Sequence, residues 1–572
     1  ILEFNMPYQA PVGEYQFIFD KVVPLKQVIE NECFSEATPD ITDAVLKECG
    51  KMCDTVMAPL QRPGDLYPAH LENGVVRTSP GFAEGYLAIA ESGWIGISAG
   101  TTHGGMGLPF AMNAAMHDMM CGACISLNLC PLLSQGQIEA LEHHASKELQ
   151  ELYLPKLISG QWTGTMNLTE PHAGSDVGAL TTKAELQSDN TYKITGQKIY
   201  ITWGEHDIAE NICHLVLARL PEAKPGPKGI SLFLVPKYIP NSDGTLGARN
   251  DLRCVSLEHK LGIHGSPTAV MEYSGATGWL VGQEHNGMAC MFTMMNNARL
   301  AVGMQGIGVA EGAYQHALAF ALERKQGRSM VPDSTGTIID HADVRRMLAH
   351  MKAEIFAARS IGAACATAID MANATDDPKW QAKAAILTPI SKSFGSDTGV
   401  SVADLGVQIH GGMGFVEETA AAQYWRDVRI TPIYEGTNGI QAMDLVARKM
   451  MDGGEAAFSL MDDMDGFIAT ANESTLSPLL GSAVDELRKT TEWLVQQDIN
   501  ERFAGAVAYQ KAFARVLGGY FHLVAAMSGE GKRVRLATFY INSLLPESVA
   551  LCAQAQTGAA DLYAIGLNDF AV

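Results

Sequence analysis

The chain has 572 residues, 47% of them hydrophobic, and a formal net charge of −22 at pH 7. One hydrophobic core rarely serves so long a chain, so we expect several domains. The negative charge argues against nucleic acid or an anionic membrane surface as a partner. An anionic ligand is still compatible with it, because a helix N-terminus or a local basic site can hold phosphates. We expect neither a signal peptide nor an apolar run long enough to cross a bilayer.

Eleven cysteines, an odd number without a secretion signal, indicate free thiols in a reducing cytoplasmic compartment. The segment "CGAC" at 121–124 is a CxxC pair. A second such pair is absent, and the flanking residues are typical of a helix rather than of a thioredoxin-like turn. We therefore favour packing cysteines over a metal or redox site.

Four regions follow one another along the chain. Residues 1–165 are predicted to be mainly helical, with apolar residues at helical spacing in 41–60. Residues 166–285 contain short β-branched runs such as "YKITGQKIYITW", separated by turn residues, which predict a β-domain. Long apolar stripes in 286–450 predict an antiparallel bundle of four long helices. The fold class is thus α+β, mainly α.

The last region, 451–572, is predicted to be an additional helical domain. It begins with "MDGGEAAF" and the acidic cluster "MDDMDG", which we interpret as a linker or boundary. The region holds 15 acidic and 8 basic residues. Such a domain repels phosphate backbones, so a role in binding nucleic acid is disfavoured.

Two segments point to chemistry. "MNLTEPHAGSDVGALTTKAE" at 166–185 stands where helices give way to strands, and Pro171 and Gly174 favour an irregular backbone whose N–H groups can face a ligand. "TPIYEGTNGIQ" at 431–441 places Glu435 in a tight bend before a helix. Taken alone, an acid in such a bend is more often a solvated loop residue.

Five segments in order resemble the motifs of the acyl-CoA dehydrogenase family. They are 166–185, "GQKIYITW" (196–203), "ERKQGR" (323–328), "QIHGGMGF" (408–415) and "YEGTNGIQ" (434–441). The resemblance covers roughly residues 40–450. It implies an N-terminal helical domain, a middle β-domain and a C-terminal four-helix bundle that bind FAD and an acyl-CoA thioester and pass electrons to electron-transfer flavoprotein.

The resemblance also gives Glu435 a role. Desaturation of a thioester at Cα–Cβ needs a base for the α-proton, opposite the flavin that accepts the β-hydride. An apolar acyl chain closing over Glu435 would desolvate the carboxylate and raise its pKa.

Further residues match family positions for FAD and for the substrate. Met166, Leu168 and Thr169 would contact the isoalloxazine ring, Thr202 would lie near its N5, and Tyr200 stands where many relatives have a stacked tryptophan. The pyrophosphate would be held across a subunit interface by Arg324, Gln326, Gln408, Gly411 and Gly412, and Thr437 and Gly439 would complete the FAD site. The substrate set is Ser175 and Arg299 near the CoA moiety, with Asn296 and Gly436.

Some positions depart from the family pattern or allow a second interpretation. Gln326-Gly327 replaces the usual Phe-Gly, Gly439 replaces a common glutamine, and Arg299 could instead be an exposed helix charge. The spacing of the histidines matches no metal-ligand pattern, so we expect no metal. These histidines are His172, His206, His264 and His410.

The sequence indicates the substrate and the oligomeric state less directly than the cofactor. The N-terminal "MPYQAPVGEYQFIF" and the additional C-terminal domain resemble a narrower subgroup acting on a short thioether acyl group. Medium- or long-chain acyl-CoA is the alternative substrate, and an acyl-CoA oxidase the alternative reaction. We expect a homo-oligomer, and a dimer rather than a tetramer because the additional domain would cover a face that relatives use for tetramer contacts.

Overall fold

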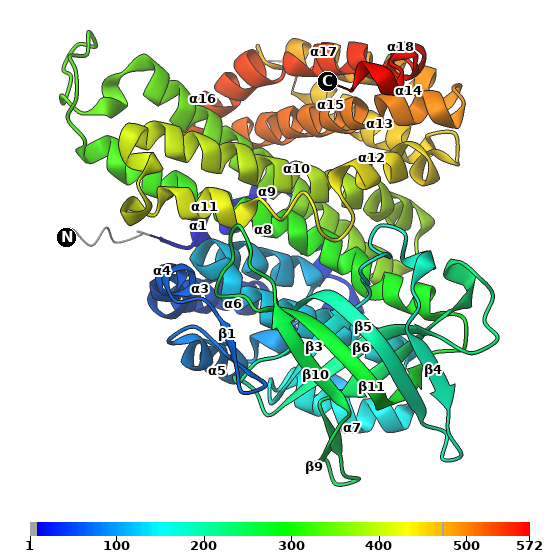
Figure 1. Ribbon diagram of the computed structural model, residues 1–572. Helices are drawn as coiled ribbons and strands as arrows, with labels where there is room; N and C mark the ends of the chain where they lie inside the picture. The colour runs from blue at the N-terminus through cyan, green and yellow to red at the C-terminus, as the bar shows by residue number, and fades with distance from the viewer. Residues whose placement is uncertain (1–7, 472–473, 572) are drawn as a thin grey trace. The chain divides into compact units, whose positions relative to one another are not determined.

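A computed structural model of the protein describes residues 8–471 and 474–571, except for the side chain of Asn296 (Figure 1). The chain forms two compact units, each made of segments that are distant in sequence. Among the described residues, one unit comprises those of 8–46, 109–118 and 299–571, and the other comprises 47–108 and 119–298. We refer to the first as the helical unit and to the second as the β-unit.

The β-unit contains a seven-stranded sheet, counted over the described residues, in the order β10-β11-β5-β4-β6-β3, with β7 pairing both β11 and β6. Its strands are β3 (Trp162–Asn167), β4 (Lys183–Leu186), β5 (Tyr192–Thr202), β6 (Asn211–Arg219), β7 (Ile230–Pro236), β10 (Leu252–Leu257) and β11 (Thr268–Val281). β7 is buried along its whole length and β6 nearly so, which explains their near-continuous apolar sequences. Among the described strands β3 pairs with β6 alone and parallel to it, so β3 lies at an edge of the sheet, and the N–H of its Gly164 donates to Oγ of Ser134 in the helix α6 (Phe110–His144).

A hairpin in this unit was not predicted. β1 (His70–Glu72) and β2 (Val75–Arg77) lie in the region expected to be helical. Asn73 and Gly74 between them both have positive φ, +49° and +81°, as a two-residue hairpin turn requires. Val76 belongs to the apolar core of the large sheet, so the hairpin extends that core. A short second ribbon pairs β8 (Tyr238–Pro240) with β9 (Leu246–Arg249).

The helices of the first 160 residues are divided between the two units. They are α1 (Val12–Phe17), α2 (Lys26–Ile29), α3 (Pro39–Met52), α4 (Ala58–Leu66), α5 (Phe82–Glu91), α6 (Phe110–His144) and α7 (Lys147–Ile158). α6 has a break at Cys124, with φ −159° and ψ 90°. Cys121 and Cys124 of the CxxC segment are both fully buried, in agreement with a packing role.

Three long helices build the bundle: α8 (Gly287–Glu323), α9 (Ala342–Thr375) and α10 (Pro378–His410). α8 and α10 run in the same direction in very close contact. A Cβ added to Gly306 would lie 2.3 Å from the carbonyl oxygen of Gly395, so glycine is required there. The shorter α11 (Ala421–Val428) and α12 (Asn438–Val446) follow. The fourth helix expected after Asn438 is therefore much shorter than predicted, because the backbone leaves helical geometry at Ala447.

The additional helices are α13 (Glu455–Thr470), α14 (Ser477–Val495), α15 (Ile499–Ala526), α16 (Gly531–Phe539), α17 (Glu547–Ala555) and α18 (Ala560–Ala564). The prediction that "MDDMDG" forms a linker is wrong, because these residues lie inside α13. Their charges are stabilised across a helix pair: Arg488 of α14 contacts Asp462 and Asp465 at 2.9 and 2.8 Å. The bend before α13 is made by Gly453 and Gly454 instead, both with positive φ.

The additional helices pack on the bundle within the helical unit (Figure 1). α15 contacts α9, α10 and α12. Gln510 of α15 donates a buried 3.0 Å hydrogen bond to the carbonyl oxygen of Pro389 in α10. Arg533 of α16 makes two hydrogen bonds to the Glu14 carboxylate, at 2.5 and 3.1 Å. The two features that resemble the narrower subgroup, the N-terminal segment and the additional domain, are thus bound to one another.

The expectation that no apolar run is long enough to cross a bilayer was wrong by length and composition. Among the described residues, α6 and α9 reach mean hydropathies of 1.2 and 1.3 over 18 residues, and the bent pair 531–544 and 547–555 would count if taken as one span. The windows in α6 and α9 are 89% and 83% buried within the protein. A helix that is apolar on all sides suits the core of a large protein as well as it suits a membrane.

Candidate active site

Glu435 lies in a strained turn immediately before α12. Its φ is +55°, and that of Gly436 is +82°, so two successive residues adopt left-handed conformations. A non-glycine residue in this region costs on the order of 1 kcal/mol and persists only where its surroundings hold it. The amide of Gln441 supplies one such contact, a 3.2 Å hydrogen bond from Nε2 to the carbonyl oxygen of Glu435. A Cβ on Gly436 would lie 2.8 Å from that same Nε2, so the turn has room only for glycine.

Two residues that follow in the sequence anchor this turn to α12. Thr437 is the N-cap, and its hydroxyl accepts a 3.2 Å hydrogen bond from the backbone N–H of Ile440. Gly439 is the second residue of the helix. Asn438, the first residue, makes side-chain contacts with α10. The turn that carries Glu435 is therefore held by hydrogen bonds to its own backbone and by its connection to α12, which contacts α10.

The charge of Glu435 is set by opposing effects. Its side chain is half-buried, and burial raises the pKa of the carboxyl, while Arg299 and Lys392 act in the opposite direction. Such a carboxylate is a stronger base than a solvated one, yet it has positive charge on two sides. This is the combination expected of a group that removes a proton near neutral pH.

Arg299 is a buried residue of α8, so its interpretation as an exposed helix charge is wrong. It is 8% exposed, and its Nη1 lies 4.0 Å from Oδ2 of Asp444 in α12. Burial lowers the pKa of Arg299, whereas Asp444 and Glu435 raise it. The side chain therefore faces the region of the catalytic turn. The side chain of Asn296, three residues earlier, lies outside the described residues.

In the β-unit, the expected ring-contacting residues surround the end of the edge strand β3. Met166 lies in β3, with Leu168 and Thr169 directly after it, and all three are half-buried. The carbonyl oxygen of Thr169 accepts a 2.9 Å hydrogen bond from the backbone N–H of Ile199 in β5, which ties the loop to the sheet. Ser175 is exposed further along the loop.

A buried ion pair, which the sequence reasoning did not single out, holds this loop. Lys198 is fully buried, and its Nζ lies 2.9 Å from both Oε1 of Glu170 and the carbonyl oxygen of Leu168. Burial raises the pKa of Glu170, but Lys198 and hydrogen bonds from Thr182 and Thr181 outweigh it and bring the pKa to about 2. Both members of the pair lie in segments that resemble family motifs, so their positions were visible although their pairing was not.

Tyr200 and Thr202 stand at the end of β5. Tyr200 has φ +59° and is 61% exposed, so its ring is free to stack on a flat ligand. Thr202 is half-buried and pairs in the sheet with Thr268 of β11. The next residue, Trp203, also has positive φ, but it is fully buried, and its Nε1 donates to the carbonyl oxygen of Ser126 at 3.2 Å.

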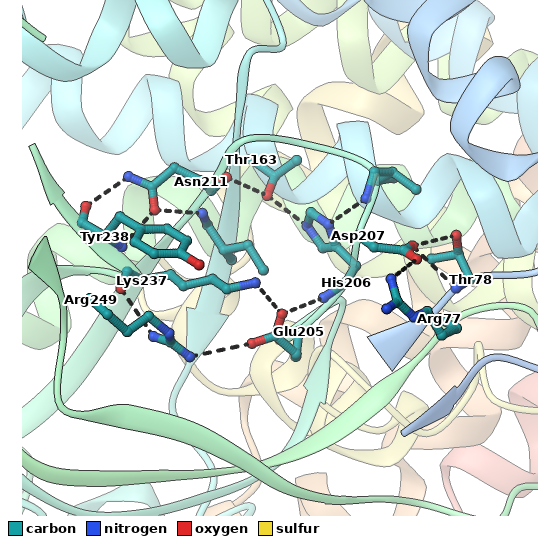
Figure 2. A network of polar contacts seen from close by, with 12 residues as sticks. Arg77, Thr78, Thr163, Glu205, His206, Asp207, Asn211, Lys237, Tyr238 and Arg249 are labelled. Atoms are coloured by element: carbon teal, nitrogen blue, oxygen red, sulfur yellow. Dashed lines mark hydrogen bonds and ion pairs between the residues drawn. The ribbon is translucent and has the colours of Figure 1, made fainter. Parts of the chain in front are cut away.

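Figure 2 shows the polar network that supports the loop after β5. The Nε2 of buried His206 lies 2.8 Å from Oγ1 of Thr163, and Glu205 contacts Lys237 directly and Arg249 at 3.8 Å. Burial and then Lys237 lower the pKa of His206 to about 3. His206 is therefore a neutral structural residue. Within the described ranges, no three His, Cys, Asp or Glu side chains are grouped as metal ligands.

The residues expected at the pyrophosphate gather at the far end of the bundle. They are exposed and lie just after α8 or at the end of α10: Arg324, Gln326, Gln408, Gly411 and Gly412. The ring of Phe320 stacks on His410 with centroids 4.4 Å apart, which brings the two helix ends together. Gly411 has φ +60°, and nothing lies within 4 Å of a Cβ built on it or on Gly412, so both leave backbone accessible.

The residues present fit FAD. In the β-unit, the end of an edge strand and an exposed aromatic ring suit the ring system, and in the helical unit an exposed arginine and open glycine backbone suit the pyrophosphate. Within one chain, however, Gln408 follows Lys392, the neighbour of Glu435, by 16 residues on α10. That separation is about 24 Å along the helix. The residues expected at the pyrophosphate and the turn that carries Glu435 are therefore separate clusters of the helical unit.

Family models match nearly the whole chain. The acyl-CoA dehydrogenase N-terminal, middle and C-terminal domains match residues 70–161, 165–276 and 285–451, and an acetyl-CoA dehydrogenase C-terminal-like domain matches 460–566. The chain belongs to the acyl-CoA dehydrogenase family. The predicted fold is confirmed, and the protein is an FAD-dependent acyl-CoA dehydrogenase.

Individual relatives agree with this. A 3-methylmercaptopropionyl-CoA dehydrogenase of Ruegeria pomeroyi is 43% identical over 92% of this chain and 92% of its own. The structure of Caenorhabditis elegans ACDH-11 in complex with C11-CoA has a TM-score of 0.77 at 20% identity, covering 93% of this chain and 91% of that one. An acyl-CoA dehydrogenase from Bacillus anthracis complexed with FAD has a TM-score of 0.73 at 21% identity, covering 91% and 88%.

The buried ion pair between Lys198 and Glu170 predicts that Glu170→Gln lowers the unfolding free energy by an amount that depends on pH. At pH 7 the variant leaves the Lys198 ammonium without its counter-charge, and we expect a loss on the order of 3 kcal/mol in unfolding free energy. The carboxylate stabilises the native state fully above its ordinary pKa of 4.5, and this contribution disappears as the pH falls towards about 2. The measurement is denaturant unfolding of both proteins from pH 7 to pH 3.

The difference between wild type and variant should shrink below about pH 4.5. Glu185→Gln, on an exposed position of β4, is the matched control and should behave as wild type throughout. A difference that stays constant in acid would show that the ion pair does not stabilise this loop.

Proposed function

We propose that the substrate is 3-(methylthio)propanoyl-CoA, which the enzyme converts to 3-(methylthio)acryloyl-CoA in the breakdown of dimethylsulfoniopropionate. The observation that carries this proposal is the 43% identity to the 3-methylmercaptopropionyl-CoA dehydrogenase, which extends over 92% of both chains and so includes the additional domain. The contact between Glu14 and Arg533 supports it further, because the two subgroup features form one structure. Medium- or long-chain acyl-CoA is the alternative.

Glu435 acts as the base of this reaction. One carboxylate oxygen takes the α-proton of the thioester as the Cα–H bond breaks, and the electron pair forms the Cα–Cβ double bond as the β-hydrogen leaves as hydride. FAD, when bound, supplies the hydride acceptor. Gln441 holds the backbone of the strained turn, while burial raises the pKa of the carboxyl and so makes the carboxylate more basic. Ser175, Arg299, Asn296 and Gly436 contact the substrate in this proposal.

Electron-transfer flavoprotein reoxidises the enzyme in this proposal, and the location is cytoplasmic. Eleven free cysteines, ten of them buried, suit a reducing compartment. If the protein were an acyl-CoA oxidase instead, turnover in air without an added acceptor would generate peroxide in proportion to product.

We further propose a homodimer in which the pyrophosphate set of one chain completes the FAD site of the other. The separation of about 24 Å along α10 supports this, because the far cluster is remote from the catalytic turn of its own chain. Met413 and Phe415 beside that cluster are 37% and 91% exposed, and a second copy of the chain would cover them.

The variant Arg324→Ala tests the shared site. We expect FAD to dissociate at least tenfold more readily, since a guanidinium can bond phosphate at two points, and the dimer to loosen with it. Equilibrium dialysis gives the FAD affinity, and light scattering gives the mass in solution. Arg345→Ala, an exposed arginine on α9, is the control. Unchanged FAD affinity would refute the placement, and a tetramer of the wild-type chain would refute the dimer.

The substrate proposal is tested with a series of acyl-CoA thioesters. Each is mixed anaerobically with the purified yellow protein while the flavin absorbance is followed. We expect 3-(methylthio)propanoyl-CoA to bleach the flavin with the highest rate constant divided by apparent Kd. A steady increase of that ratio towards medium or long straight chains would favour the alternative.

A further inference from the structure

A fully buried lysine lies beneath the catalytic turn. Lys392 belongs to α10, its exposed fraction is 0%, and its Nζ donates a 2.8 Å hydrogen bond to Oδ1 of Asn438. Asn438 is the first residue of α12 and follows Glu435 by three positions. Its Nδ2 in turn donates to Oδ1 of Asp397 at 2.7 Å and to Oγ of Ser396 at 3.0 Å. The ammonium group is therefore tied to the first residue of α12 by a buried polar network.

This position is unfavourable for a cation unless an anion compensates it. A buried ammonium loses its hydration, and the N-terminus of a helix repels positive charge. Two carboxylates face Lys392, those of Glu435 and Asp397, and one further cation, Arg299. Asp397 already accepts from Asn438 and has a second cation, Lys511 of α15, at 3.8 Å. Glu435 is left as the main counter-charge of Lys392.

Arg299, the second cation near Glu435, also interacts with another carboxylate. Arg299 has Asp444 of α12 at 4.0 Å, and Asp444 also pairs with Arg448. From the elements packed around the turn in the helical unit, the charged groups that act on Glu435 are thus Arg299 of α8 and Lys392 of α10. Within the part of the chain that the structure describes, Lys392 has no carboxylate oxygen within 4.0 Å, whereas Arg299 has that of Asp444 at 4.0 Å.

We propose that Lys392 is a positioning residue for the reaction: it keeps the half-buried Glu435 ionised before substrate binds and holds the catalytic turn through Asn438. The inference rests on Glu435 being the base. Burial lowers the pKa of Lys392 to about 8, with Glu435 and Asp397 opposing that shift, so the lysine is largely protonated at neutral pH. Once Glu435 has taken a proton, the same ammonium remains as a fixed positive charge at the first residue of α12.

The test is the titration of Glu435 in Lys392→Met, a variant whose unbranched side chain is one atom shorter and carries no charge. Infrared difference spectra against pH report the protonated carboxyl band, which is assigned by its loss in Glu435→Gln. We expect the band to titrate about one pH unit higher in Lys392→Met, since an opposite charge nearby favours the ionised form. This readout needs neither substrate nor turnover.

Flavin reduction by acyl-CoA should follow. The pH below which the rate of flavin reduction falls should also be about one unit higher in Lys392→Met. At pH values below that point, Lys392→Met should therefore be about tenfold slower than wild type. Lys511→Met is the matched control: it removes an equal charge from the same network, but at a side chain that is 52% exposed, and it should leave both titrations unchanged. Lys392→Gln, which retains a donor for Asn438 but no charge, is the second variant should Lys392→Met not fold.

The outcomes separate this inference from the proposed function. Wild type that bleaches with acyl-CoA, together with a Glu435 band that titrates identically in wild type and either Lys392 variant, overturns the inference alone. A shifted band in protein that no acyl-CoA bleaches supports the coupling of Lys392 to Glu435 and overturns the role of that pair in catalysis. An equal shift of the Glu435 band in Lys511→Met also overturns the inference, because the shift would then be a general effect of net charge.

Discussion

The proposed mechanism depends on the placement of one carboxylate, that of Glu435, where burial and nearby positive charge act on it in opposite directions. Glu435 would be a weak base in water and would be protonated at neutral pH if it were buried alone. Burial raises its pKa, while Arg299 and Lys392 lower it, so the group can be both ionised and basic. The left-handed turn fixes the backbone that carries this side chain, directly before the first residue of α12.

Much of the helical unit serves to keep this balance. α8 and α10 carry the two cations, and glycines allow these helices to approach until backbone meets backbone. α15 of the additional domain supports α10 through Gln510 and also contacts α12. The additional domain is thus more than a cover for the bundle, since its longest helix braces both helices that position Glu435 and Lys392.

The sequence predicted the order of the domains, the cofactor and the family because these depend on local signals. Tight turns and glycine-rich strings such as 408–415 are short, and apolar stripes record burial directly. The same approach missed the hairpin at 70–77, although its Asn-Gly turn is a strong local signal. It also misjudged "MDDMDG", because an acidic run fits a helix as well as a linker once Arg488 pairs with it.

Residues that act across long distances in the sequence could not be predicted in this way. Lys392 lies 43 positions before Glu435, in a segment that contains no recognisable motif, and a lysine in such a helix is usually solvated. Lys198 and Glu170 lay inside recognised motifs, but only the sheet brings them within 2.9 Å. Arg299 was placed near the substrate by resemblance, yet its burial against Asp444 emerges only from the packing of α8 on α12.

The central claim is that Glu435 removes the α-proton, and the anaerobic half-reaction of Glu435→Gln tests it most directly. The amide keeps the size of the side chain, and Gly436, Thr437 and Gln441 are untouched, so the turn, bound FAD and acyl-CoA binding should all persist. Because a general base contributes about 10²–10⁴-fold, flavin bleaching should slow by at least that range while the substrate still binds. Flavin reduction in the variant within a few-fold of the wild-type rate would contradict the account and return Glu435 to an ordinary turn residue.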